Sequence, residues 1–252
     1  MRLVALLAIA ACGSAAPPPA AAPAAPPAQD RMADHDHDHA HDHDGDHDHE
    51  HGPNAAHEHH GGMPHRFENA DEWAKQFDDP SRDAWQQPDR VIAALALAPT
   101  MTVADVGAGT GYFSVRLARA VPQGQVLATD IEPDMVRYLG ERAAREHLPN
   151  IKAVLAGADD PNLAPGSVDR ILVVDVWHHL GDRTRYAASL AKALRPGGKL
   201  LVVDFTAAAD RGPPKDMRLP PDAIIADLRA AGLTAALDPT QLPDQYIVVG
   251  SR

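Results

Sequence analysis

The chain has 252 residues and a net charge of −12, and its composition changes sharply near residue 66. Residues 1–65 hold ten acidic residues against Arg2 and Arg31, so residues 66–252 are only mildly acidic, with a net charge of −4. Neither part carries a basic patch, which excludes nucleic-acid binding as the expected function class. Because Cys12 is the only cysteine, an intrachain disulfide is excluded and the fold must be stabilised by its core.

The first twelve residues resemble a bacterial lipoprotein signal. Residues 3–11 form an apolar run after Arg2 that is too short to span a bilayer as a helix but fits an export signal. The stretch Ile9-Ala-Ala-Cys12-Gly13 resembles a lipobox, and in that family the cysteine becomes the lipidated N-terminus after cleavage. The resemblance implies a lipid anchor at Cys12 and a place in the bacterial cell envelope. The alternative is an ordinary N-terminus on a cytoplasmic protein.

Residues 13–33 and 34–65 have low-complexity sequences of two different kinds. The first is rich in Ala and Pro, which favours an extended, semi-rigid linker. The second interleaves His with Asp, cannot bury an apolar face, and is expected to be disordered. Imidazoles among carboxylates suit divalent Zn, Ni or Cu, although an acidic solubilising segment is the alternative interpretation. The candidate metal ligands are His35, His37, His39, His41, His43, His47, His49 and His51.

Residues 66–252 alternate between strand and helix patterns. Residues 66–100 favour helices with breaks, including one that Pro88 opens. Strands are predicted at 101–106, 125–130, 151–155, 168–174, 199–205, 233–237 and 245–250, and helices near 111–121, 133–147, 182–194 and 221–231. Uninterrupted apolar runs such as 171–174 and 200–203 indicate strands buried on both faces. The alternation predicts an α/β fold with a doubly wound, mostly parallel sheet, whose ligands bind at the carboxyl ends of the strands.

The first predicted strand ends in a glycine-rich turn. Gly107, Gly109 and Gly111 follow the apolar run 101–106, and a helical pattern starts at Tyr112. Glycines at such a turn let a ligand approach the backbone, and the N–H groups at the helix start favour a polar or anionic ligand group. A dinucleotide fingerprint needs G-x-G-x-x-G, whereas this turn has the spacing G-x-G-x-G.

The turn resembles the first motif of the class I S-adenosylmethionine-dependent methyltransferases, as in Asp105-Val-Gly107-Ala108-Gly109-Thr-Gly111. The resemblance covers roughly residues 66–252. It implies a Rossmann-like sheet of seven strands with the last one antiparallel, and S-adenosylmethionine as the cofactor. It further implies that Gly107, Ala108, Gly109 and Gly111 hold the methionine part of the cofactor and that Asp105 helps to orient its amino group.

Asp130 ends the second predicted strand and is a candidate ribose ligand. A carboxylate there can accept two hydrogen bonds from a ribose diol, and the matching position does so in the methyltransferase family. A capping role before the helix at Pro133 is the alternative. Ile131, the next residue, is grouped with Asp130 as a cofactor contact.

The segment Gly157-Ala-Asp159-Asp160-Pro161 follows the third predicted strand. The family often has an acid here that holds the adenine amino group. Asp159 matches this position best, while Asp160 and a plain Asx turn stay open.

Candidate catalytic residues follow the fourth predicted strand and the glycine turn. In the family, the segment Asp175-Val-Trp-His178-His179 lines the place where cofactor and acceptor meet. His178 could act as a general base, with Asp175 beside it, and Tyr112 is expected to face the transferred methyl group. A structural role for the paired histidines is the alternative.

Three further segments are expected around the site. Arg195-Pro-Gly-Gly198 is predicted to be a turn before the fifth strand. Lys215 and Arg218, on a polar loop, are candidates for binding an acidic acceptor group. Trp85-Gln-Gln87 is a candidate cover for the cofactor, with a packed helical cap as the alternative.

We therefore expect a methyltransferase that acts on a small-molecule acceptor. No protein nucleophile is needed, because the cofactor is already activated and positioning supplies much of the acceleration. The alternative, from another class, is an envelope metal-binding lipoprotein whose methyltransferase-like domain only binds. This alternative is considered because the cofactor is made in the cytoplasm, whereas a lipoprotein faces outward.

Overall fold

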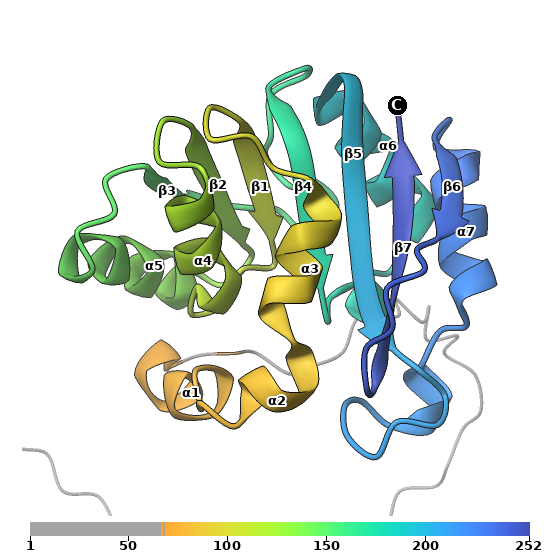
Figure 1. Ribbon diagram of the computed structural model, residues 1–252, viewed down its shortest axis with the longest axis horizontal. Helices are drawn as coiled ribbons and strands as arrows, with labels where there is room; N and C mark the ends of the chain where they lie inside the picture. Colours follow the sequence, from red (N-terminus) through yellow and green to blue (C-terminus); the bar gives the residue numbers. More distant parts are fainter. Residues whose placement is uncertain (1–66, 68) are drawn as a thin grey trace, which may run out of the picture. The chain divides into compact units, whose positions relative to one another are not determined.

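The computed structural model describes Phe67 and residues 69–252, which form a central sheet with helices on both faces (Figure 1). The expected signal, linker and histidine tract, with Cys12 and the candidate metal ligands, lie outside the described residues. Within the described part of the chain, no helix is long and apolar enough to cross a membrane.

Seven strands form one sheet in the order β3-β2-β1-β4-β5-β7-β6. Their bounds are β1 Thr102–Val106, β2 Gln125–Asp130, β3 Ile151–Leu155, β4 Val168–Val174, β5 Leu194–Phe205, β6 Thr234–Leu237 and β7 Gln245–Ser251. Neighbouring strands among β1–β5 pair in parallel, while β7 pairs antiparallel with both β5 and β6. The predicted fold class, a doubly wound and mostly parallel seven-stranded sheet, is confirmed.

Seven α-helices and two short 3-10 helices connect or precede the strands in the described residues. They are α1 Ala70–Phe77, α2 Arg82–Gln86, α3 Pro88–Leu95, α4 Tyr112–Ala120, α5 Pro133–Arg145, η1 Trp177–His179, α6 Arg183–Ala193, η2 Lys215–Met217 and α7 Pro221–Ala230. Proline occupies the start of α3, α5 and α7, where its missing N–H has no intrahelical partner to lose.

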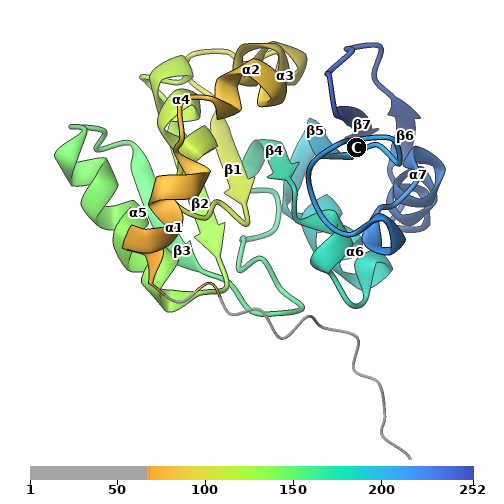
Figure 2. The same ribbon diagram turned by 90° about the horizontal axis from the view of Figure 1, so that it is seen from below.

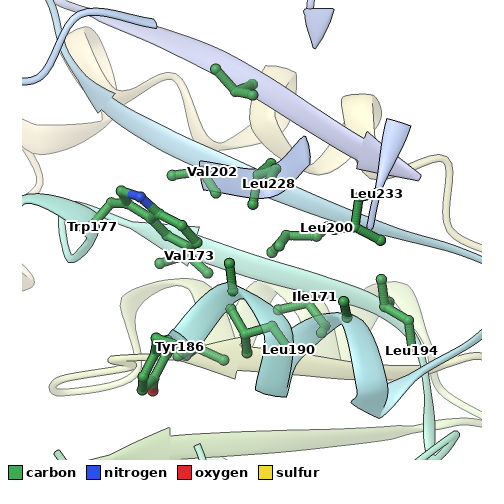
Figure 3. Packing of buried hydrophobic residues seen from close by; sticks show 14 of the residues in the cluster. Ile171, Val173, Trp177, Tyr186, Leu190, Leu194, Leu200, Val202, Leu228 and Leu233 are labelled. Carbon is green, nitrogen blue, oxygen red and sulfur yellow. The ribbon is translucent and has the colours of Figure 1, made fainter. Parts of the chain in front are cut away.

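Each face of the sheet buries its own apolar core. On one face α6 and α7 pack against β4, β5 and β7, and Figure 3 shows Leu190 and Leu228 among the side chains around Val173 and Val202. On the other face α3 and α4 cover β1, β4 and β5. The strands therefore need apolar residues at successive positions, which explains the uninterrupted runs in the sequence.

The expected turn at Arg195-Pro-Gly-Gly198 is instead part of β5, which begins at Leu194. Leu194 pairs with Val168, and the register then shifts before Arg170 pairs with Lys199. The four residues thus form an irregularity inside the strand. The prediction of a separate turn before the strand was wrong, because β5 already begins at Leu194 and its pairing with β4 continues at Lys199.

Helices α1 and α2 lie beneath the carboxyl ends of the parallel strands, at the lower edge of Figure 1, and Figure 2 views the molecule from that side. Ala70 N donates a 2.6 Å hydrogen bond to Asp134 Oδ2 at the start of α5. Arg142 Nη1, on α5, donates to Asp78 Oδ1 at the end of α1 (2.7 Å) and to the Thr110 carbonyl of the glycine turn (2.9 Å). These bonds hold the N-terminal helices over the edge where ligands bind in such sheets.

Candidate functional site

The glycine turn between β1 and α4 has a backbone that other residues rarely adopt. Gly107, Gly109 and Gly111 have φ values of 69°, 55° and 91°. A Cβ added at Gly107 would lie 2.3 Å from Val176 Cγ2, and one at Gly111 would lie 2.8 Å from Leu139 Cδ2. The turn therefore depends on glycine for conformation and for packing, as its motif predicts.

Asp130 connects the end of β2 to the glycine turn. Its Oδ2 accepts a 2.8 Å hydrogen bond from Gly109 N, and its Oδ1 accepts one of 3.0 Å from Glu132 N. The residue is 8 % exposed, and burial raises the pKa of its carboxyl against the effect of these N–H donors. The N-cap position of α5 is occupied by Glu132, not Asp130. Next to Asp130, Ile131 is 52 % exposed and offers an apolar surface.

Asp105 is buried beneath the turn, near the end of β1. It is 3 % exposed and accepts a 2.6 Å hydrogen bond from Ser114 Oγ on the first turns of α4. Burial raises the pKa of Asp105 to about 6, although the Ser114 hydroxyl favours the charged form. Asp105 thus ties the strand to the helix that the glycine turn connects.

The two candidate acids after β3 occupy different environments. Asp159 lines the cavity described below, with Arg185 Nη1 3.7 Å from its Oδ2. Asp160 Oδ1 accepts a 2.8 Å hydrogen bond from Asn162 N, which is an Asx-type turn. Asp159 is therefore the acid whose position suits a ligand contact.

Aromatic side chains of α1 and the residues before it cover the glycine turn. Phe77 lies against Gly109, where an added Cβ would be 3.5 Å from its ring. Trp73 stacks on Phe77 with ring centroids 5.2 Å apart, and Phe67 meets Trp73 edge-on at 5.0 Å. Sequence reasoning placed apolar residues here without assigning them to the site.

A closed ring of polar contacts joins α2 to the sheet. Gln86, which is fully buried, donates through Nε2 to Gln245 Oε1 at the start of β7, and Gln245 Nε2 donates to Asp175 Oδ1. Arg82 closes the ring, with Nη2 3.0 Å from Gln86 Oε1 and 3.7 Å from Asp175 Oδ2. Of the expected cover Trp85-Gln-Gln87, Trp85 lines the cavity while Gln86 fixes the helix.

Asp175, directly after β4, has a φ of 60°, a conformation that costs energy for a residue with a Cβ. Its side chain is 21 % exposed, and burial raises its pKa to about 7, with Arg82 acting in the opposite direction. Strained backbone and a perturbed carboxyl in one residue are typical of functional sites.

His178 is paired with an acid that the sequence did not single out. Its Nδ1 lies 2.9 Å from Asp204 Oδ1 and 3.1 Å from Oδ2, and the two side chains are 3 % and 0 % exposed. Asp204 lies near the end of β5 and also accepts a 2.8 Å hydrogen bond from Phe205 N. The available signal for this contact was an acid near the end of the predicted strand 199–205, which the structure places beside β4.

Tyr112 stands at the start of α4 with its hydroxyl already bonded. The hydroxyl donates to Asp83 Oδ1, and Arg116 Nη2 binds the same carboxylate oxygen at 2.8 Å. The guanidinium carbons of Arg82 and Arg116 lie 4.1 and 4.0 Å from the centroid of the Tyr112 ring. Burial raises the pKa of Tyr112. The ring therefore reaches the cavity, but the hydroxyl is bonded to Asp83.

Arg218 does not present its guanidinium to a ligand. Its Nη1 donates to the Ala209 carbonyl (2.6 Å), its Nε to the Pro213 carbonyl (2.9 Å) and its Nη2 to the Arg211 carbonyl (3.0 Å). Arg218 thus shapes the loop after β5. Neither Arg218 nor Lys215 lines the cavity.

One cavity of about 1720 Å³ brings these elements together at the carboxyl edge of the sheet. The candidate residues that line it are Asp105, Gly107, Ala108, Gly109, Tyr112, Asp130, Ile131, Asp159, Asp175 and His178. Gly111 is the exception, because it is the N-cap of α4 and packs against Leu139. The described residues contain no cluster of His, Cys, Asp and Glu that could hold a metal ion.

Comparison with known proteins finds similarity to methyltransferases over the same region. Residues 103–198 match a family model described as a methyltransferase domain. An uncharacterised methyltransferase of Mycobacterium tuberculosis is 40 % identical over 117 residues, which are 46 % of this chain and 44 % of the relative. A ubiquinone/menaquinone biosynthesis C-methyltransferase of Marinomonas is 31 % identical over 106 residues, covering 41 % of this chain and 42 % of that protein.

Among solved structures, an S-adenosylmethionine-dependent methyltransferase from Aquifex aeolicus superposes with a TM-score of 0.67. It is 26 % identical, and the alignment covers 71 % of this chain and 97 % of the other. The chain spans less than half the length of the curated relatives it matches.

Proposed function

We infer that the domain is a class I S-adenosylmethionine-dependent methyltransferase, the family that the match over residues 103–198 and the related proteins support. The observation that carries the inference is the glycine turn between two buried acids, Asp105 and Asp130, on the wall of one large cavity. The family match ends at residue 198, so the reaction of the whole chain is part of the proposal.

The residues around the turn fit this cofactor. Gly109 N and Glu132 N occupy one lone pair on each oxygen of Asp130, and the remaining lone pairs can accept from a ribose diol. Ile131 offers its exposed apolar side chain to the adenine, and Asp159 offers a carboxylate to the adenine amino group.

The charge of the site also fits. Burial raises the pKa of Asp105, Asp130 and Asp175, so the neighbours of these three acids only partly compensate their charged forms. A cationic ligand supplies the remaining compensation. S-adenosylmethionine carries its methyl group on a positively charged sulfur and so supplies an already activated methyl.

His178 is the candidate general base, and Asp175 the second catalytic candidate. Both line the cavity immediately after β4, beside the turn that would hold the cofactor. Tyr112 contributes its ring to the wall of the cavity, and its hydroxyl keeps its bond to Asp83. The chain's part in the reaction is to orient the acceptor and to accept its proton.

We propose a small molecule as the acceptor. The relatives are named for different reactions, among them ubiquinone/menaquinone C-methylation, arsenite methylation and malonyl-[acyl-carrier protein] O-methylation. Their names therefore support methyl transfer without identifying one acceptor for this chain.

Isothermal titration of the full chain with S-adenosylmethionine tests the cofactor assignment. We expect saturable binding, weakened about 10- to 100-fold by Asp130→Ala, because hydrogen bonds to a charged acceptor contribute about 1.5–3 kcal/mol each. Asp160→Ala is the matched control, since Asp160 forms only a surface turn. Absence of binding at millimolar cofactor would overturn the proposed function.

We further propose that the N-terminal segment anchors the protein in the envelope through Cys12 and that the histidine tract binds Zn, Ni or Cu. The support is the lipobox-like sequence and the interleaved His and Asp residues. Membrane fractionation of a Cys12→Ala variant tests the anchor. If the variant partitions with the membrane as wild type does, lipid anchoring is excluded.

A further inference from the structure

The lining of the cavity has an unusual concentration of aromatic rings. The chain contains only eleven Phe, Trp and Tyr residues, all of them within the described part of the chain. Seven line the cavity, namely all four phenylalanines with Trp85, Tyr112 and Tyr186. Such clustering in a chain of low aromatic content points to a ligand with a flat apolar surface.

Two of these rings, Trp85 and Phe205, form a wall of the same cavity that His178 lines. Trp85, on α2, stacks on Phe205, at the end of β5, with centroids 5.9 Å apart and ring planes inclined by 30°. The guanidinium of Arg211 lies 5.1 Å from the Trp85 ring centroid and is itself held by Asp244 at 2.8 Å. Because Phe205 directly follows Asp204, the wall and the acid are fixed by the same strand end.

The Asp204 carboxylate determines which nitrogen of His178 is available. Phe205 N donates to Asp204 Oδ1, and in the tautomer in which His178 donates to the same carboxyl, the ring proton is on Nδ1. His178 Nε2 then has its lone pair available, and the described residues provide it with no hydrogen-bond partner. A base is needed only by an acceptor that is not already ionised, such as a hydroxyl.

Resting on the proposed function, we propose that the acceptor is a hydroxylated aromatic ring packed against Trp85 and Phe205, with Asp204 as the positioning residue for the base His178. The hydroxyl proton passes to His178 Nε2. An oxygen lone pair then forms the new O–CH₃ bond while the S–CH₃ bond breaks, and its electrons leave the sulfur neutral. The imidazolium returns its proton to solvent.

Methyl transfer by the full chain to three matched probes tests this proposal. Catechol is the ring with ordinary hydroxyls, cyclohexane-1,2-diol has the same size without the aromatic ring, and 4-nitrocatechol is a more acidic ring. We expect transfer to catechol and not to the aliphatic diol. If titration shows that S-adenosylmethionine binds but no methyl group is transferred to catechol, the proposed acceptor class is overturned and the cofactor assignment is retained.

Asp204→Asn separates positioning from a purely structural role. It should lower kcat for catechol about 100-fold, within the range of general-base effects, without changing the affinity for S-adenosylmethionine. The reduction in kcat should be smaller for 4-nitrocatechol, because an acceptor that ionises by itself has less need of a base. An equal loss for both rings would contradict the assignment.

Two further variants keep the test decisive. Asp169→Asn is the matched control, since Asp169 binds Thr102 N and Arg195 at the opposite edge of the sheet, and it should affect both rings equally. His178→Gln removes the base directly. It should lower kcat more for catechol than for 4-nitrocatechol, and it provides this test even if Asp204→Asn fails to fold. If His178→Gln retains wild-type kcat with catechol, the dyad has no part in the reaction.

Discussion

Three carboxyl groups in the cavity make the stability of the fold and the binding of a cationic ligand depend on pH. Burial raises the pKa of Asp105 to about 6 and that of Asp175 to about 7, and it raises the pKa of Asp130 as well. In the protein without ligand, the folded state therefore holds protons that the unfolded state has released. These acids make the fold less stable as pH rises from about 4 towards 7.

A cationic ligand bound near these carboxyl groups lowers the free energy needed to ionise them. We expect the preference for S-adenosylmethionine over S-adenosylhomocysteine, which lacks the sulfonium charge, to increase about tenfold between pH 5 and pH 8, equivalent to roughly 1.4 kcal/mol. The increase should level off near pH 8, about one unit above the pKa of Asp175. Isothermal titration with both compounds across this range measures it, and a ratio independent of pH would contradict the electrostatic explanation.

Among single residues, sequence reasoning identified the glycine and acid positions but missed Asp204. The glycines are recognisable because a turn at a strand end leaves a local pattern. The contact between His178 and Asp204 depends on the pairing of Val174 with Val203, which brings the ends of β4 and β5 together. Considering polar residues near the ends of different predicted strands as possible partners would have suggested this contact.

Among the elements, α1 and α2 form a cover over the carboxyl edge of the sheet and are joined to the rest of the domain by polar side-chain contacts. Arg142 holds α1 through Asp78, and both side chains are mostly buried, at 13 % and 20 % exposed. Exposed helices fixed by a few polar contacts open more readily than core strands. The stability of this cover is therefore set by interactions different from those that stabilise the sheet.

Replacing Arg142 with Met should loosen the cover selectively. The change leaves the Asp78 carboxylate without its partner, and we expect amide hydrogen exchange in residues 70–86 to accelerate about tenfold, while exchange in β1 stays unchanged. Arg119→Met is the control, because Arg119 is 62 % exposed in its ion pair with Glu146. Equal acceleration in both segments would mean that Arg142 stabilises the whole domain instead.

The strands were predictable and the contacts of the cover were not. Strands buried on both faces leave long apolar runs, so their predicted bounds agree with the structure within a residue or two, except where β5 begins. The bond between Gln86 and Gln245 joins residues 159 positions apart. Two isolated glutamines carry no pattern that would reveal such a pairing before the chain is folded.

At the scale of the whole molecule, we expect the chain to divide its functions between two parts. Among the described residues, the members of the two apolar cores lie at or after Val91. The family match begins later still, at residue 103. The N-terminal 66 residues should therefore contribute to location and metal binding rather than to cofactor binding.

Deleting residues 1–66 tests this division. We expect the shortened protein to keep its thermal unfolding midpoint and its affinity for S-adenosylmethionine, and to lose the binding of Ni²⁺ or Zn²⁺ that we propose for the full chain. Calorimetry, titration with S-adenosylmethionine and titration with the metal measure these three properties. A more than tenfold loss of cofactor affinity would mean that the two parts act together.

The reversed direction of β7 separates the two ends of the domain. Gln245 opens this strand at the cavity, whereas Ser251 pairs with Lys199 at the far edge of the sheet, where Figure 1 marks the C-terminus. Phe67, at the other end, belongs to the cavity wall. A purification tag or fusion partner attached behind Arg252 would consequently leave the mouth of the cavity unobstructed.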